Sequence, residues 1–523
     1  VPPTRSEAAR FLTQATYGPS TSDVDRVIAL GYAAWLEEQF NSQASTHLPA
    51  VPAYGDIISP LFLGPYPLQS TFWTKAATAP DQLRQRTMYS LSQIFVISMH
   101  DQNVLGYPQG IATYMDMLAR NSFGNYRQLL EDVTLSPMMG LYLSHLANQK
   151  EDSATGRVPD ENYAREVMQL FSIGLYELNA DGTVKLDSRR EPIETYSNND
   201  VIGLARVLTG WSWSSPVKDE TSFQANRGFF VTDDRALKPM ELYPQYHSPS
   251  AKSFLGKTIP ANTGGQESLK QALDHLFNHP NVGPFIGKQL IQRTVTSNPS
   301  PAYVTRVAAA FDNNAQGVRG DMRAVWRAIL LDPEARDAAK LNDPQFGKLR
   351  EPVLRLSAWI RAFNVKSTSG NYNVFFIDDP ASGIGQAAFR SPSVFNFYRP
   401  GYVPPGTGAA AAGLVVPEMQ ITSEFSATSY INFVENMAVL GGTGFLLDLT
   451  ADYSAERAMA DNVDALVNHM DERLTYGVMS TETKALMREA VGSVPLNTFD
   501  ARGNRVRLAL LFALASPDFI VQR

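Results

Sequence analysis

Apolar side chains recur at helical spacing along most of the chain. Between residues 81 and 97, for example, Leu83, Met88, Leu91 and Ile94 follow such a spacing and predict a helix. The same pattern predicts two helices within residues 5–40 and further helices at 111–120, 126–135, 199–208, 267–277, 284–292, 303–313, 322–331, 351–363 and 505–516. We therefore expect a mostly α fold, with more than half of the residues helical.

Three stretches of the chain lack this helical pattern. Residues 178–186 place a glycine-containing turn between short extended pieces, which predicts a small hairpin. Residues 211–265 are rich in aromatic residues and Pro without clear periodicity, and residues 364–422 form a long irregular connection rich in Gly, Pro and Ser. We expect few strands, confined to regions such as 178–186 and 211–260.

The predicted organisation is a single large multi-helical body with a few short β-hairpins and long irregular loops. Its expected regions are an N-terminal helical region (1–177), a hairpin and aromatic loop region (178–265), a helical region (266–363), the irregular connection (364–422) and a C-terminal helical region (423–523).

Composition and charge exclude several classes of protein. A hydrophobic fraction of 44% in 523 residues allows a large core. The net charge is −7 and no basic run is present, which argues against nucleic acid as a partner because phosphate binding needs a concentrated cationic face. No apolar stretch is long enough for a transmembrane segment.

The chain contains no cysteine. Cysteine nucleophiles, cysteine-ligated zinc, iron–sulfur clusters and disulfides are therefore excluded. A cysteine-free chain of this length fits an exported bacterial protein, located in the periplasm, at the cell surface or outside the cell. The sequence starts at Val1 without a signal peptide, so we expect any such peptide to have been removed.

The segment 159–174 carries the most informative pattern. On a helix, Tyr163, Val167 and Phe171 share an apolar face, and Asn162, Glu166 and Gln169 form a polar stripe along its edge. Glu166 would be partly desolvated there, which raises a glutamate pKa and suits a general acid or base. Glu161 and Arg165 are spaced to pair on the neighbouring face. The alternative is that Glu166 only closes a buried hydrogen-bond network, in which case we expect it mostly buried and bonded to an arginine or a backbone N–H.

The motif Asn162-Tyr163-Ala164-Arg165-Glu166, followed by Leu170-Phe171 and Gly174, resembles the hallmark of DUF1800, a large bacterial family of unknown function. Other segments resemble the family in the same order, namely residues 84–86, 91–96, 121–125, 208–211, His247 with 252–256, 391–397, 399–402 and 516–519. One position departs from the family pattern, because Asp160 stands where the family usually has Asn. The resemblance implies exported, largely helical proteins, often encoded beside a second secreted family with a phosphatase-like or sulfatase-like appearance. It implies no catalytic residues.

Oxygen-bearing side chains alternate in the turn at residues 177–187. Asn179 and Asp181 precede Gly182 in the way that an EF-hand loop begins, so these two residues are candidate calcium ligands. The twelfth position of such a loop is Ser188 instead of a bidentate Glu, and the same residues are also common in hairpin turns. Both interpretations stay open, and no other cofactor is indicated.

Further candidate residues lie in the aromatic loops. His247 sits in one loop region, and its alternative role is that of a structural, hydrogen-bonded histidine. Aromatic clusters such as 211–213 and 395–399 could stack against sugar rings or simply pack onto helices. The nucleophile elbow of esterases, the phosphate loop of NTPases and the glycine pattern of dinucleotide enzymes do not occur in the sequence.

Two function classes follow from these patterns. The first is a secreted hydrolase or lyase acting on an extracellular polymer such as polysaccharide, and the alternative is a non-catalytic surface or periplasmic protein that binds a glycan or a co-encoded secreted partner. Catalytic candidates are Glu166, Glu161 and His247, and binding candidates are Asn162, Arg165, Trp211, Asn396, Tyr398 and Arg399. We expect residues 391–406 to fold back beside the motif, with Arg390 or Arg399 paired to Glu161 or Glu166.

Overall fold

The computed structural model describes residues 2–52, 65–225, 234–374, 377–439 and 448–523. Helices account for 53% of the residues, and the described strands form only short antiparallel pairs. The predicted mostly α fold is therefore confirmed. None of the helices within the described ranges has both the length and the apolar character needed to cross a bilayer.

Three helices, instead of the predicted two, occupy the first forty residues. They are α1 (Arg5–Ala15), α2 (Thr21–Leu30) and α3 (Tyr32–Asn41). Gly31, between α2 and α3, has a φ of +79°. Glycine adopts this left-handed conformation without strain, so the chain bends there instead of continuing one helix.

Helix α6 (Gln82–Ser92) is buried along its whole length. It ends at Ser92 rather than at residue 97 as predicted, because the chain then runs beside Phe389, whose carbonyl accepts a hydrogen bond from the Met99 N–H at 2.8 Å. The other helices of this part are α5 (Pro65–Thr78), α7 (Gln102–Leu105), α8 (Pro108–Asn121), α9 (Tyr126–Leu135) and α10 (Pro137–Tyr142).

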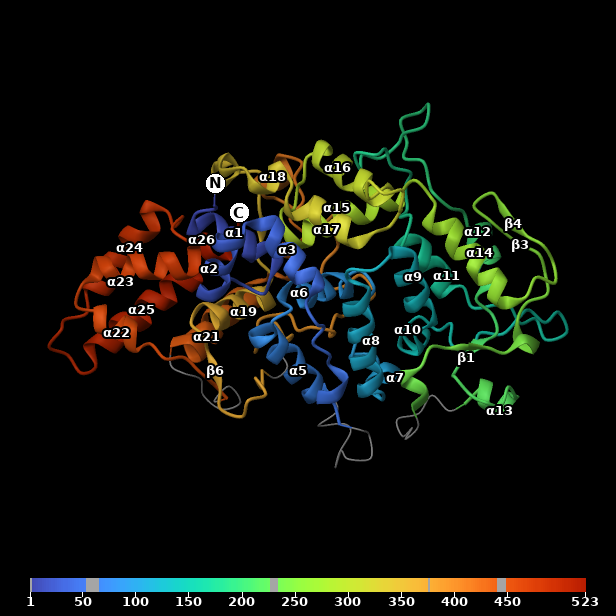
Figure 1. Cartoon of the computed structure of the whole chain (residues 1–523), viewed down its shortest axis with the longest axis horizontal. Helices are drawn as coiled ribbons and strands as arrows, with labels where there is room; N and C mark the ends of the chain where they lie inside the picture. Colours follow the sequence, from blue (N-terminus) through green and yellow to red (C-terminus); the bar gives the residue numbers. More distant parts are fainter. Residues whose placement is uncertain (1, 53–64, 226–233, 375–376, 440–447) are drawn as a thin grey trace.

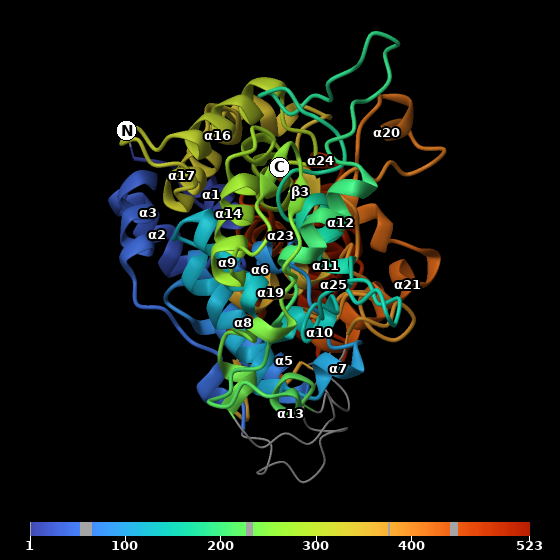
Figure 2. The ribbon, with the colours of Figure 1, turned by 90° about the vertical axis from the view of Figure 1, so that its right-hand side faces the viewer.

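One end of the molecule, on the right of Figure 1 and facing the viewer in Figure 2, carries the segments around the family-like motif. Its helices are α11 (Asn162–Gln169), α12 (Asn198–Val207), α13 (Glu220–Phe223) and α14 (Gly265–Phe277). Its strand pairs are β1 (Trp211–Ser212) with β2 (Glu241–Leu242), and β3 (Lys252–Phe254) with β4 (Lys257–Ile259).

Residues 175–194 form an arm between α11 and α12 that projects from the body in both views. Three antiparallel bridges join Tyr176 to Glu194, Leu178 to Val184, and Leu186 to Pro192. The pairing of Leu178 with Val184 confirms the small hairpin predicted at residues 178–186.

The second half of the chain is again helical. It contains α15 (Val282–Thr294), α16 (Pro301–Asp312), α17 (Met322–Leu330), α18 (Pro333–Arg336), α19 (Pro352–Ala362), α20 (Gly408–Ala411), α21 (Glu424–Val434), α22 (Ser454–Met459), α23 (Val463–Met470), α24 (Thr481–Gly492), α25 (Ala501–Ala515) and α26 (Pro517–Ile520). Short 3₁₀ turns are η1 (Leu48–Ala50), η3 (Asp234–Leu237), η4 (Pro244–Tyr246), η5 (Ala338–Asn342) and η6 (Pro417–Ile421), and π-helical turns are η7 (Glu435–Val439) and η9 (Asp471–Thr475).

Two strand pairs lie outside the predicted strand regions, so the confinement of strands to those regions is wrong. Strand β5 (Lys348–Leu349) pairs with β8 (Val521–Gln522), and β6 (Lys366–Ser367) pairs with β7 (Leu449–Thr450). Each pair joins segments that are far apart in the sequence, and two residues are too few to show an alternating pattern. The β5–β8 pair brings the last described residues beside α1, where the Arg10 side chain donates a hydrogen bond to the Arg523 carbonyl at 3.2 Å.

A continuous cluster of buried apolar side chains extends from Ala8 in α1 to Phe519 in α26. It includes residues from all five of the regions expected from the sequence. Helices α11 and α15 both contribute to this cluster, so the polar edge of the family-like motif rests on the main core.

Candidate functional site

Helix α11 is held in place by its apolar face. The Tyr163 ring is buried and stacks on His145 at a centroid distance of 3.9 Å, and its hydroxyl lies 2.8 Å from the Thr134 hydroxyl. At the start of the helix, Asp160 accepts a hydrogen bond from the Asn162 N–H at 2.8 Å. This anchoring fixes which side chains stand on the opposite, polar edge.

Glu166 lies on that polar edge and is only 8% exposed. Its Oε2 atom is buried without a hydrogen-bond partner, and the carboxylate forms no hydrogen bond within the described part of the chain. Burial raises the pKa of Glu166, and the neighbouring Arg165 opposes that rise. The predicted burial is found, whereas the hydrogen bond that we expected with it is not formed.

Polar groups of α11 and of the segment before α12 surround Glu166. Arg165 pairs with Glu161 at 3.7 Å, as the spacing predicts. The Tyr196 hydroxyl donates to Gln169 Oε1 at 2.9 Å. Burial raises the pKa of Tyr196, Arg165 lowers it and Glu166 raises it, which places this phenol within electrostatic range of both. We call Arg165, Glu166, Gln169 and Tyr196 the α11 site.

Tyr196 was missed by the sequence analysis. It follows the arm and is separated from the motif by the whole length of that hairpin-like segment. Its position depends on the turn at Gly174, where φ is +74° and where an added Cβ would lie 2.8 Å from the Phe285 ring. A lone tyrosine in a polar stretch carries no sequence signal that would have indicated this role.

Asn162 lies at the exposed start of α11, next to the α11 site. Its side-chain amide is 3.4 Å from the Ser144 hydroxyl, and that hydroxyl donates to Asp160 at 3.0 Å. Asp160 therefore accepts hydrogen bonds at the start of the helix through its carboxylate.

The proposed calcium ligands form a tight turn at one corner of the arm. The Asp181 carboxylate accepts hydrogen bonds from the Thr183 N–H at 2.9 Å and from its hydroxyl at 2.6 Å, and the Asn179 amide donates to that hydroxyl at 2.9 Å. No group of three metal-ligating side chains occurs among the described residues. These contacts account for both side chains as turn residues, and calcium binding there stays a prediction.

His247 and Trp211 lie in the interior and not on the polar edge of α11. Both are buried, and His247 Nδ1 is 2.8 Å from the Thr209 carbonyl, so Nδ1 carries the proton and Nε2 the lone pair. Burial lowers the pKa of His247, which keeps the ring neutral. The Trp211 carbonyl accepts a hydrogen bond from the Ala147 N–H at 2.8 Å, which ties this region to the segment before α11.

The loop residues proposed for binding do not pair with the acids of the motif. Arg390 pairs with Asp378 at 2.8 Å, and the Arg399 guanidinium packs over the Phe395 ring at 4.4 Å. The predicted pairing of either arginine with Glu161 or Glu166 is therefore wrong for the described residues. Arg390 pairs with an acid that is closer in the sequence, and Arg399 packs on an aromatic ring of its own loop.

Asn396 and Tyr398 of the same loop are buried. Asn396 is left-handed, with φ at +63°, and its side-chain nitrogen has no hydrogen-bond partner among the described residues. The Tyr398 hydroxyl lies 3.4 Å from Gln93 Oε1, at the end of α6. The side chains of Asn396 and Tyr398 therefore lie inside the body, and Tyr398 contacts the end of α6.

A buried cluster of charged groups lies where Tyr398 meets α6, and the sequence analysis missed it. Lys348 pairs with Glu418 at 2.8 Å and lies 3.7 Å from Glu351, and all three side chains are fully buried. Burial would raise the pKa of Glu351, but Lys348 and Arg86 hold it below its ordinary value. Burial raises the pKa of Glu418. The cluster links β5, α6 and the loop before α21, and its enclosure favours a structural role.

Four cavities of the structure lie away from all these candidates. None of the candidate residues proposed from the sequence lines any of the four, which lie beside α1, α19, α21 and α25. The α11 site is thus a partly covered polar edge and not one of these hollows.

The whole chain was compared with known proteins. No curated protein and no solved structure matches it. A family model described as "Protein of unknown function (DUF1800)" matches residues 10–521, which is nearly the full length. The matched range includes the α11 site and the buried charged cluster. The chain therefore belongs to the DUF1800 family.

Proposed function

We propose that the protein is a binding protein whose ligand is a hydroxyl-rich molecule, such as an extracellular polysaccharide, held at the α11 site. One observation carries this proposal: the Glu166 carboxylate is buried, yet its Oε2 has no hydrogen-bond partner among the described residues. Buried polar atoms of native proteins nearly always have a partner, and each exception needs an explanation. A ligand hydroxyl would supply that partner.

The neighbouring groups suit a sugar. The raised pKa of Glu166 increases the share of its protonated form, which can donate a hydrogen bond as well as accept one. Arg165 adds donors, and Gln169 with Tyr196 adds a mixed donor and acceptor pair. Sugar hydroxyls donate and accept in the same way, so this set of groups is complementary to them.

A hydrolase or lyase with Glu166 as its general acid is the second candidate. The raised pKa favours it, because a general acid must keep its proton near neutral pH. Hydrolysis by a pair of acids needs a second free carboxyl at about 5–10 Å. The acid nearest in sequence, Glu161, is paired with Arg165. Binding therefore has the stronger support.

We also propose that the protein is exported and meets its ligand outside the cytoplasm. The absence of cysteine from 523 residues supports this, as does the exported character that the sequence resemblance implies. A co-encoded secreted protein is the proposed partner. The exposed apolar side chains of the arm, Leu175, Tyr176, Val184 and Leu186, offer a surface for such a contact.

Pull-down with insoluble polysaccharides tests the binding proposal. The panel contains cellulose, chitin, starch, xylan and peptidoglycan. We expect the wild type to bind at least one of them, and Glu166→Leu to weaken that binding by at least about tenfold, since it removes the polar contact. Glu489→Leu, at an exposed position of α24 outside the α11 site, is the matched control and should bind like the wild type. Binding that is equal in Glu166→Leu, or absent for the whole panel, contradicts the proposal.

Glu166→Gln separates the two candidate functions. The amide keeps hydrogen-bonding capacity at Glu166 but cannot transfer a proton as a carboxylic acid does. A binding protein should retain most of its affinity in this variant and release no new reducing ends from the polysaccharide. Release of reducing ends by the wild type, lost in Glu166→Gln, would instead establish the hydrolase.

A further inference from the structure

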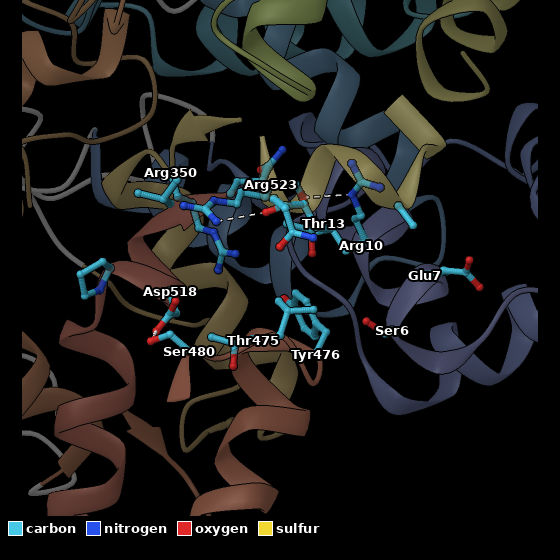
Figure 3. Close-up of a pocket in the computed structure, with 17 residues that line it drawn as sticks. Ser6, Glu7, Arg10, Thr13, Arg350, Thr475, Tyr476, Ser480, Asp518 and Arg523 are labelled. Carbon is cyan, nitrogen blue, oxygen red and sulfur yellow. Dashed lines mark hydrogen bonds between the residues drawn. The ribbon is translucent and has the colours of Figure 1, made fainter. Parts of the chain in front are cut away.

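A cavity of about 470 Å³ lies between α1 and the segment that contains α26 and β8, next to the C-terminal helices. Figure 3 shows Arg350 and Asp518 on one side of it and Arg10 and Glu7 on the other. Its volume is within the range of small-molecule sites. Segments from the beginning, the middle and the end of the chain meet here, because β5 pairs with β8 beside α1.

Arg350 is the most unusual group in the cavity wall. It is 4% exposed, and its guanidinium packs over the Phe519 ring at 4.5 Å. Its side chain donates no hydrogen bond to the described residues, and Nε and Nη1 are buried without an acceptor. Arg350 also forms no ion pair with the described residues. The adjacent acid, Glu351, lies in the buried charged cluster beside Lys348 instead. Burying an unpaired cation strongly destabilises the folded state unless an anion lies beside it.

A second buried arginine adds positive charge to the opposite wall. Arg10 is 7% exposed, and its Nη2 has no acceptor among the described residues, although its other nitrogens donate to backbone carbonyls. Arg336 lies behind it. Burial lowers the pKa of Arg336 to about 10, and repulsion from Arg10 contributes to that lowering.

The two acids of the wall are already occupied. Glu7 accepts hydrogen bonds from the Thr4 N–H at 2.8 Å and the Thr4 hydroxyl at 2.7 Å, which form the capping box of α1. Asp518 accepts from the hydroxyls of Ser480 at 3.0 Å and Thr483 at 2.5 Å. Both acids therefore accept hydrogen bonds from nearby residues, whereas N–H groups of both buried arginines have no acceptor among the described residues.

The rest of the wall combines polar side chains with an apolar group that consists of Ala338, Leu341, Val478, Pro517 and Val521. We propose that this cavity binds a small organic anion, in which a carboxylate or phosphate head contacts Arg350 and an apolar body lies along these side chains. The planar guanidinium fork matches both kinds of head group. This site is independent of the binding proposed for the α11 site.

Titration calorimetry with simple probes tests this inference. Hexanoate and hexyl phosphate carry the proposed head and body, acetate and inorganic phosphate carry the head alone, and hexanol carries the body alone. We expect hexanoate or hexyl phosphate to bind at least about tenfold more tightly than hexanol and than its own head group. Comparing the two anions identifies the preferred head. Equal affinity for hexanol and the anions, or no binding of either anion, overturns the proposal.

Two variants assign the binding to this cavity. Arg350→Met should weaken anion binding by at least about tenfold. Val478→Trp, at an exposed position of the wall, adds bulk to the cavity and keeps the Arg350 side chain, so it tests the assignment if Arg350→Met does not fold. Arg502→Met, which removes an exposed arginine paired with Asp461, is the control and should bind like the wild type. Unchanged anion binding in Val478→Trp contradicts the assignment.

Discussion

At the scale of single residues, the two acids Glu166 and Glu351 behave in opposite ways. Both are buried, but Oε2 of Glu351 accepts hydrogen bonds from the Gln386 and Gln93 amides, and Lys348 lies 3.7 Å from its Oε1. Oε2 of Glu166 has neither a hydrogen-bond partner nor an ion-pair partner among the described residues. A partnered carboxylate stabilises the fold, and an unpartnered one weakens it. Glu351 thus belongs to the architecture, whereas Glu166 is the acid for which we propose a ligand partner.

Replacing Glu166 by Gln should stabilise the ligand-free protein. The folded-state pKa of Glu166 is raised, so the fold is weakened as pH rises above the ordinary value and the carboxylate ionises. We expect Glu166→Gln to raise the free energy of unfolding at pH 7 by about 1 kcal/mol, the lower end of the cost of a buried unpaired acceptor. Urea denaturation measures it, and the gain should vanish in acid. A loss of stability at pH 7 would mean that Glu166 has a structural partner.

The buried cluster should show the reverse dependence on pH. The folded-state pKa of Glu351 is lowered, so its stabilisation is present above the ordinary pKa and is lost as pH falls through the folded value. Glu351→Gln should therefore cost about 3 kcal/mol at pH 7 and much less in acid. Glu418→Gln, at the other partner of Lys348, is the comparison, and its raised pKa predicts little loss at pH 7. Equal losses in both variants would refute the assignment.

At the scale of elements, the close contact of α12 with β3 positions the segment that carries Tyr196. An added Cβ at Gly203 in α12 would lie 1.8 Å from the Ser253 carbonyl oxygen. Gly203→Ala should cost about 3 kcal/mol or more, because backbone must move. Gly492→Ala in α24, where an added Cβ meets nothing within 4 Å, is the control and should be neutral or stabilising. Thermal unfolding compares them, and a tolerated Gly203→Ala would show that the contact is looser.

Elements with their own periodicity and caps could be predicted from the sequence, and those that depend on distant partners could not. Helix α9 was predicted with its bounds, since an apolar stripe follows the Asn125 cap. Strands β5 and β8 have two residues each and exist only because the chain folds back on itself. The same limit applies to the site: the burial of Glu166 follows from helix geometry, whereas its proximity to Tyr196 depends on the path of the arm.

At the scale of the whole molecule, the continuous core predicts cooperative unfolding. All six tryptophans lie at or before Trp359, whereas α21 to α26 contribute only to the helical signal. Tryptophan fluorescence and far-ultraviolet circular dichroism should therefore report the same thermal midpoint, as expected when one core joins both parts. Two separate midpoints would show that the C-terminal helices form an independent unit.

The most direct test of the α11 site is a crystal structure of the wild-type protein grown with the polysaccharide fragment that the pull-down panel identifies. The account predicts a sugar hydroxyl within about 3 Å of Glu166 Oε2. It also predicts that Arg165 or Tyr196 contacts the same fragment. A fragment bound elsewhere on the molecule, with Glu166 Oε2 still lacking a partner, would contradict the account.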